Sequence, residues 1–269
     1  MHYFTFEQLE KFAKIAISAS KLAGEAILKF YKTDLLVDYK IDGSPLTMAD
    51  TSANRIIIKT LLTTYLPIVS EESIEIPFES NYYWLVDPLD GTKDFLAGND
   101  EFTVNIALIE IDKPVIGIVF APALNELFVG IKGETAWAEI NGELKIAKNL
   151  EKSDILKMAI SRFHDHYDAN FFATENKIQH FIPIGSSLKY GRLIFGEADV
   201  FPRLVGSSEW DTAAGQAILE AAGGLMLDWN TGDSLRYNKT NRRNGRFIAI
   251  RSPYKFSDFI YQKHNSELL

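Results

Sequence analysis

The sequence predicts two halves of different fold class, an α+β half over residues 1-150 and an α/β half over residues 151-269. Two observations predict this division. Helical segments followed by a run of short strands, separated by polar or Gly/Pro turns, are typical of an α+β arrangement with an antiparallel sheet. After the charged passage from Asn141 to Ser153, strands and helices alternate, as in α/β proteins. We therefore expect the boundary between the halves in this passage.

The chain opens with the pattern of a long amphipathic helix. Thr5 and Gln8 have the spacing of a capping box, and apolar residues recur at helical spacing from Leu9 to Phe30. Many of these residues are alanines, whose small side chains favour close packing against another helix. A second helix is expected from Ala49 to about Tyr65, because Pro67 cannot continue it.

Short strands dominate the rest of the first half. A strand at Ile68–Ser70 leads into the acidic pair Glu71-Glu72, and Tyr82–Val86 has the composition of a half-buried strand. Since Pro88 cannot donate a hydrogen bond to a ladder, regular pairing should stop near Asp87. Four further strands are expected, at Thr103–Ile109, Val115–Phe120, Glu126–Val129 and Thr135–Ala138.

Five elements alternate in the second half. The predicted strands and helices are a strand at Met158–Ile160, a short helix at Ser187–Phe195, a strand at Ala198–Phe201, a helix at Trp210–Ala222 and a strand at Phe247–Ile250. Gly223 and Gly224 should stop the last of these helices.

The composition excludes several classes of protein. Hydrophobic residues make up 46% of the chain, which is typical of a globular protein and not of a disordered one. The net charge of -8 argues against broad nucleic-acid binding, which needs a basic face. The chain has no cysteine and no apolar run of transmembrane length, so we expect a cytoplasmic protein with no integral membrane segment. Peripheral association with the inner membrane and the choice between monomer and homodimer stay open.

The stretch Asp87-Pro88-Leu89-Asp90-Gly91-Thr92 is the most informative in the chain. A strand delivers two carboxylates into one turn, and Gly91 allows the backbone to bend tightly enough for them to converge. Carboxylate oxygens suit hard cations such as Mg²⁺, and the N–H groups of Gly91 and Thr92 would suit a phosphate if they open a helical turn. The alternative is that Asp-Pro and Asp-Gly are ordinary turn formers, which is the commoner case for either pair alone.

This string resembles the signature of the inositol monophosphatase superfamily, which comprises Mg²⁺-dependent, lithium-sensitive phosphomonoesterases. The resemblance implies a layered αβαβα sandwich of the inositol monophosphatase / fructose-1,6-bisphosphatase type that binds two or more Mg²⁺ ions. It implies a first metal held by Glu71, Asp87 and the Leu89 carbonyl. A second metal would be shared by Asp87, Asp90 and Asp211, the acid of Trp210-Asp211-Thr-Ala-Ala-Gly215. Asp211 would open the helix, where the macrodipole alone would also justify an acid.

The same resemblance assigns the catalytic pair. It matches Thr92 with Asp50, the last residue of Pro45-Leu-Thr-Met-Ala-Asp50. Asp50 would orient the Thr92 hydroxyl, which would accept a proton from the attacking water. The alternative is that Thr92 is only a turn residue.

Three further stretches narrow the resemblance. Ile184–Tyr190, Glu101–Leu108 and Phe201-Pro202-Arg203 are similar to the bacterial CysQ-type 3'(2'),5'-bisphosphate nucleotidases. These enzymes remove the 3'-phosphate of adenosine 3',5'-bisphosphate (PAP) and leave AMP. The resemblance implies a small-molecule substrate, PAP, with the sulfated precursor PAPS left open as a second one. The implied substrate contacts are Glu71, Leu89, Asp90, Gly91, Thr92, Ser186, Lys189, Arg203 and Asp211.

Two other functions are compatible with these motifs. An inositol monophosphatase would share the metal site, although the second phosphate of PAP requires extra cationic donors such as Lys189 and Arg203. The other is a non-catalytic sensor of metal and nucleotide, which would have no use for the pair Thr92 and Asp50. Each cationic residue taken alone is more often a surface residue.

Overall fold

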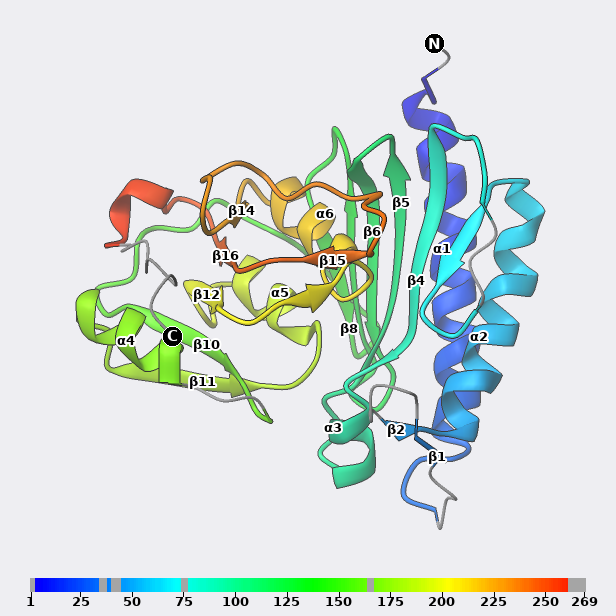
Figure 1. Ribbon diagram of the computed structural model, residues 1–269, viewed down its shortest axis with the longest axis horizontal. Helices are drawn as coiled ribbons and strands as arrows, with labels where there is room; N and C mark the ends of the chain where they lie inside the picture. The colour runs from blue at the N-terminus through cyan, green and yellow to red at the C-terminus, as the bar shows by residue number, and fades with distance from the viewer. Residues whose placement is uncertain (1–2, 34–37, 40–44, 74–76, 164–166, 261–269) are drawn as a thin grey trace.

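The computed structural model describes residues 3–33, 38–39, 45–73, 77–163 and 167–260 as five alternating layers of helices and sheets (Figure 1). Helices α1 and α2 cover the outer face of a seven-stranded sheet, and α5 and α6 lie between that sheet and a five-stranded one. Helix α4 packs on the outer side of the second sheet. The predicted αβαβα sandwich is therefore confirmed. The division near residue 150 stays a prediction, and its C-terminal end, residues 261-269, lies outside the described residues.

The two N-terminal helices form as their sequence predicts. Helix α1 spans Phe6–Leu28 with the Thr5/Gln8 capping box in place, and its alanine-rich face is buried. Helix α2 spans Met48–Leu61, and a 3-10 turn, Leu62–Thr64, ends at Tyr65 in the left-handed conformation with φ 58°. The regular helix is thus shorter than expected. Both helices share one apolar core with the adjoining sheet face.

The seven-stranded sheet has the order β3-β4-β5-β6-β7-β8-β9. Its pairs are antiparallel, as the hairpin pattern predicts, except that β3 and β4 run parallel. The strands are β3 Ile68–Ser70, β4 Tyr82–Asp90, β5 Thr103–Glu110, β6 Lys113–Ala121, β7 Glu126–Ile131, β8 Trp137–Ile140 and β9 Glu143–Ile146. Strand β8 begins two residues later than expected.

Strand β9 occupies the first part of the passage Asn141–Ser153, in which the boundary is expected. The turn residues Asn141 and Gly142 have φ of 53° and 84°, a two-residue turn that folds the chain back onto β8. All four side chains of β9 are exposed, and Leu144 and Ile146 alternate with Glu143 and Lys145 over only four residues. The first sheet therefore extends into the charged passage.

The five-stranded sheet is mixed, with the order β11-β10-β12-β16-β14. Its strands are β10 Lys157–Ser161, β11 His180–Ile184, β12 Val200–Arg203, β14 Leu225–Asp228 and β16 Phe247–Ile250. The helices of this half are α4 Tyr167–Glu175, α5 Leu188–Ile194 and α6 Ala213–Ala221. Two small ladders pair β1 Asp38–Tyr39 with β2 Pro45–Leu46, and β13 Ser207–Ser208 with β15 Arg243–Asn244; a 3-10 turn, Phe256–Asp258, follows β16.

Helix α6 lies directly against the first sheet because two glycines leave room for it. A Cβ atom on Gly117 of β6 would lie 2.1 Å from the Ala214 carbonyl oxygen, and one on Gly130 of β7 would lie 2.5 Å from the Cα atom of Ile218. This close approach brings the start of α6, and with it Asp211, near the end of β4.

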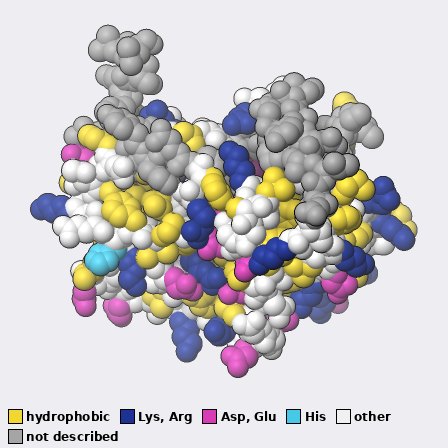
Figure 2. Space-filling view, turned by 90° about the horizontal axis from the view of Figure 1, so that it is seen from below, with side chains coloured by type: hydrophobic (Ala, Val, Ile, Leu, Met, Phe, Trp, Pro, Cys, Tyr) yellow, Lys and Arg dark blue, Asp and Glu magenta, His cyan; other side chains and the backbone are white. Residues whose placement is uncertain are grey.

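Two surface properties bear on partners. Within the described ranges, the chain forms no helix with the length and apolar character needed to cross a bilayer. On the face seen from below Figure 1, Lys and Arg side chains are interspersed with Asp and Glu instead of forming a basic patch (Figure 2).

Candidate functional site

The central motif forms the irregular end of β4. Pairing with β5 is regular up to Asp87, and the register then shifts before Asp90, which lies opposite Thr103. Strand β4 therefore continues past the expected stop, but with a bulge where Pro88 stands. The Asp87 carboxylate accepts a hydrogen bond of 3.1 Å from the Leu89 N–H. This bond closes the turn that brings Asp90 toward Asp87.

Gly91 and Thr92 open a helix, as the phosphate-binding hypothesis requires. Helix α3 spans Thr92–Ala97, and Gly91 is its N-cap in the left-handed conformation, with φ 85°. A side chain at residue 91 would be strained by this φ and would also approach Ser186 Cβ at 3.0 Å. The turn thus requires glycine and leaves the backbone accessible from the cavity side.

The carboxylates of Glu71, Asp90 and Asp211 lie close enough to Asp87 to raise its pKa. Glu71 follows β3, which runs beside β4, and its N–H donates to the Val86 carbonyl. The pKa of Asp87 is raised well above its usual value, first by burial and then by the charges of Glu71, Asp90 and Asp211. Glu71 and Asp87 also share a hydrogen bond. An added cation would relieve this repulsion.

Asp211 reaches the cluster from the opposite half of the chain. It lies in a turn two residues before α6, so it precedes the helix and does not open it. Its Oδ2 accepts hydrogen bonds from Ser207 Oγ at 2.7 Å and from the Ser208 N–H at 3.0 Å. Burial, followed by the charge of Asp90, raises the pKa of Asp211 to about 7.

The oxygen ligands of this group are of the type that binds a hard divalent cation, but in this structure they do not surround a common point. Mutually repelling carboxylates and a backbone carbonyl are the ligands that Mg²⁺ prefers. In the part of the chain that the structure describes, no three His, Asp or Glu side chains are grouped closely enough to hold a metal as they stand. Their oxygens are instead hydrogen-bonded to serine, amide and carboxyl groups.

Thr92 and Asp50 are placed on neighbouring elements, α3 and the start of α2. The short strand β2, directly before α2, packs against α3. The Thr92 hydroxyl donates to the Leu89 carbonyl at 3.4 Å. Asp50 Oδ2 accepts from Thr47 N–H at 2.8 Å and from Thr47 Oγ at 2.7 Å. Both residues are described, and no hydrogen bond joins them, so the Asp50–Thr92 relay remains a prediction.

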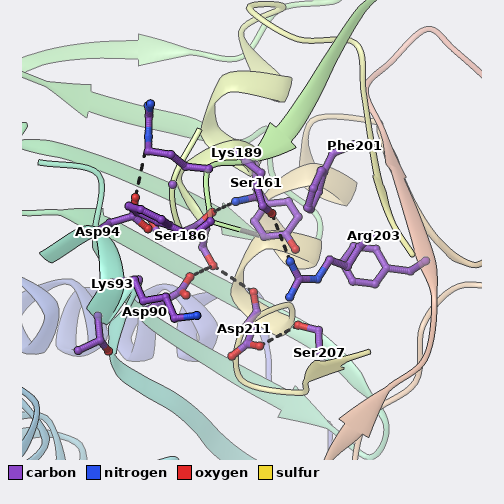
Figure 3. A pocket seen from close by; sticks show the side chains of 18 residues that line it. Asp90, Lys93, Asp94, Ser161, Ser186, Lys189, Phe201, Arg203, Ser207 and Asp211 are labelled. Carbon is purple, nitrogen blue, oxygen red and sulfur yellow. Dashed lines mark hydrogen bonds and ion pairs between the residues drawn. The ribbon is translucent and has the colours of Figure 1, made fainter. Parts of the chain in front are cut away.

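A cavity of about 290 Å³ lies beside this cluster (Figure 3). Seven of the predicted site residues line it, namely Asp90, Gly91, Thr92, Ser186, Lys189, Arg203 and Asp211. Asp50, Glu71, Asp87 and Leu89 do not belong to its lining. Segments from both halves of the chain thus meet at one cavity, and two of the acids outside its lining, Asp50 and Asp87, are buried.

Two cationic residues, Lys189 and Arg203, belong to the lining of the cavity (Figure 3). Lys189 is buried; its ammonium donates to the Ile184 carbonyl at 3.1 Å and the Ser186 carbonyl at 2.6 Å. Burial lowers the pKa of Lys189 to about 8. An ammonium has three donors, so one remains for a ligand. Arg203 donates to Ser161 Oγ at 3.2 Å.

Several residues of the site were not predicted. Asp94, whose pKa burial raises, lines the cavity, and so do Arg162 and Ser187. Ser187 lies inside the Gly-Ser-Ser-Leu-Lys motif, so its place near the site could have been suspected. Arg162 follows a predicted strand but belongs to no quoted motif. Its guanidinium binds Glu101 at 2.7 Å, a contact between distant segments that no local pattern indicates.

Comparison with known sequences gives one consistent family. Over residues 8–264 the chain matches the Inositol monophosphatase family. It is 41% identical over 224 residues to the 3'(2'),5'-bisphosphate nucleotidase CysQ of Salmonella typhimurium, a match that covers 80% of this chain and 89% of the relative. The protein of the same name from Buchnera aphidicola is 39% identical over 243 residues, with 88% and 89% covered.

Solved structures agree with the sequence comparison. CysQ from Bacteroides thetaiotaomicron, described as a bacterial member of the inositol monophosphatase family, superposes with a TM-score of 0.80 at 33% identity, covering 90% of this chain and 97% of that one. An inositol monophosphatase from Zymomonas mobilis gives 0.73 at 28% identity, with 90% and 92% covered.

Proposed function

This chain belongs to the inositol monophosphatase family, and from that premise we propose that it is a Mg²⁺-dependent 3'(2'),5'-bisphosphate nucleotidase that hydrolyses PAP to AMP. PAPS is a second candidate substrate. The observation that carries the proposal is that one cavity is lined both by the acids Asp90 and Asp211 and by the cations Lys189 and Arg203. A substrate with two phosphates can place the reacting one at the acids and the other at the cations.

The group of acidic residues would hold the metal. We assign Glu71, Asp87, the Leu89 carbonyl, Asp90 and Asp211 as ligands, since these oxygens lie at the junction of β4 with the turn before α6. When bound, Mg²⁺ would neutralise charge on the reacting phosphate and on its leaving oxygen. The Gly91 and Thr92 N–H groups at the start of α3 would orient the phosphate.

Thr92 and Asp50 would manage the proton of the attacking water. The Thr92 hydroxyl lines the cavity, where it can accept a hydrogen bond from water and pass a proton inward. Burial raises the pKa of Asp50, which makes its carboxylate a better proton acceptor. The two Thr47 bonds fall on Asp50 Oδ2, so Oδ1 is the oxygen we assign to Thr92.

Lys189, Arg203 and Ser186 would bind the phosphate that does not react. Ser186 has a left-handed backbone with φ 43°, and the Lys189 ammonium donates to its carbonyl. This loop is therefore held in a strained conformation by the same cation that faces the substrate. An inositol monophosphate has no second phosphate to occupy this side.

Phosphate release from a small panel tests the proposal. PAP, PAPS, inositol 1-phosphate and fructose 1,6-bisphosphate should be compared at equal concentration, with Mg²⁺ and with excess chelator. We expect Mg²⁺-dependent release that is fastest from PAP. Faster turnover of inositol 1-phosphate would make the protein an inositol monophosphatase, and no release from any substrate would favour a sensor. We expect the enzyme in the cytoplasm; the absence of cysteine fits a reducing compartment.

A further inference from the structure

Ser187 connects the acidic residues of the two halves. Its side chain is 2% exposed, at the N-cap of α5. Its Oγ lies 2.6 Å from Asp90 Oδ2 and 3.0 Å from the Asp211 backbone carbonyl. We propose that Ser187, supported by Asn105, is a positioning residue that orients the Asp90 carboxylate for metal binding. The inference rests on the proposed metal-dependent function.

The direction of these hydrogen bonds follows from donor counting. The Ser187 hydroxyl has one proton to donate. The Asp90 carboxylate is a stronger acceptor than the Asp211 carbonyl and lies closer, so the proton points to Asp90. Asn105 Nδ2 then donates to Ser187 Oγ at 2.8 Å and approaches Asp90 Oδ2 at 3.2 Å. The Thr103 hydroxyl donates to Asn105 Oδ1 at 3.0 Å, which fixes the orientation of the amide. Thr103, Asn105 and Ser187 thus form one buried chain that ends on Asp90.

This chain acts on one oxygen of Asp90 only. Both Ser187 and Asn105 bind Oδ2, so the carboxylate is held with Oδ1 as the oxygen available to a cation. Hydrogen bonds that orient a ligand in this way affect metal affinity strongly, although they do not touch the metal. Asp90 comes from β4, which lies beside the β5 strand that carries Asn105 and Thr103. The support is therefore built on regular sheet.

The loop that carries Ser187 is itself fixed. The Gly185 N–H donates to Glu101 Oε2 at 2.7 Å, and a Cβ atom at residue 185 would lie 2.5 Å from an Asp94 oxygen. Lys189 closes the other side by donating to the Ile184 and Ser186 carbonyls. Ser187 has little freedom to move, so its hydroxyl imposes a position on Asp90 and does not follow it.

Calorimetric titration of Mg²⁺ without substrate tests this role in Ser187→Ala. Loss of a supporting hydrogen bond to a metal ligand typically weakens metal affinity by about 10–100-fold, and we expect a change of that size in Kd. Turnover of PAP should require correspondingly more Mg²⁺ and should largely recover at saturation. Ser20→Ala is the matched control. Ser20 is also buried and donates within α1, to the Ile17 carbonyl, so its loss should leave Mg²⁺ affinity unchanged.

Asn105→Ala is the second variant, in case Ser187→Ala does not fold. This variant retains the Ser187 hydroxyl but removes the amide that supports it, so we expect a smaller increase in the Kd for Mg²⁺. Unchanged Mg²⁺ affinity in a folded Ser187→Ala protein would overturn the inference, as would a loss confined to kcat/KM for PAP, which would make Ser187 a substrate contact. If the wild type binds Mg²⁺ but does not hydrolyse PAP, the proposed function fails while a weakened Ser187→Ala still supports the inference.

Discussion

Glu209 and Asp211 are two residues apart, but their carboxylates lie in opposite electrostatic environments. Glu209 is fully buried and accepts bonds from the N–H groups of Asn238 and Lys239, from the Lys239 ammonium at 3.2 Å and from the Arg242 guanidinium at 3.4 Å. Asp211 lies at the cavity wall in the field of Asp90 and Glu71. The protein supplies cations for the structural acid and gathers further acids around the other. We infer that the second group is completed by ions from solution.

Asp90→Asn should break the acidic group most severely. Removing one carboxylate from a shared site weakens metal binding and leaves charge on the reacting phosphate unneutralised, so turnover of PAP should be nearly abolished. Excess Mg²⁺ should rescue little. Near-normal steady-state turnover of this variant at ordinary Mg²⁺ concentrations would remove Asp90 from the ligand set.

Thr92→Ala and Asp50→Asn should each lower kcat by about 10²–10⁴-fold, the usual contribution of a positioned general base, with smaller changes in KM. If the two residues act as one unit, the double variant should be little worse than either single variant. Steady-state kinetics of all three proteins checks this. Additive losses would show that the residues act separately.

Glu209→Gln should lower the stability of the folded protein. It leaves Arg242 and Lys239 without their buried counter-charge, and breaking a buried ion pair in this way costs roughly 3–5 kcal/mol of unfolding free energy. Urea unfolding of the two proteins measures the difference. Asp90→Asn, which removes a repelling charge, should unfold no earlier than the wild type. Equal losses of unfolding free energy in both variants would contradict the distinction between the structural acid Glu209 and the repelling acids around Asp211.

Lys189→Met should have the smallest effect, and mainly on substrate selection when Mg²⁺ is saturating, since Lys189 also fixes the loop that carries Ser187. A charge-assisted bond to phosphate contributes about 1.5–3 kcal/mol, so kcat/KM for PAP should fall roughly 10- to 150-fold. Activity on inositol 1-phosphate should hardly change. Comparing both substrates on the same preparation supplies the control; an equal fall for both would place Lys189 in the catalytic centre.

Local signals predicted the parts of this fold that are fixed locally. The capping box of α1 and the turn at Gly91 depend on residues a few positions apart, and both form as expected. Strand β11 was missed because Pro183 interrupts its pattern, which is tolerated at the edge of a sheet. Strand β9 was missed because its alternation, from Glu143 to Ile146, covers only four residues of a charged passage.

The site shows the same limit. The acids lie at strand and helix ends that the sequence marks, but the hydrogen bonds that orient them do not follow from spacing. Ser187 lies 97 residues from Asp90 in sequence and is hydrogen-bonded to it. The direction of the Lys189 ammonium, toward two carbonyls of its own loop, likewise depends on tertiary packing.

Proton release on Mg²⁺ binding tests the central claim most directly. A raised pKa of about 7 keeps Asp211 partly protonated in the metal-free folded protein at pH 7, and this shift lowers folded-state stability as pH rises from the ordinary value of 3.8 through about 7. The pKa of Asp87 is raised in the same direction. Because ligands must be deprotonated, calorimetry in buffers of different ionisation enthalpy should detect protons released at pH 7 and fewer at pH 9. Binding without proton release at pH 7, or no binding at all, would contradict the assignment of this acidic group as the metal site.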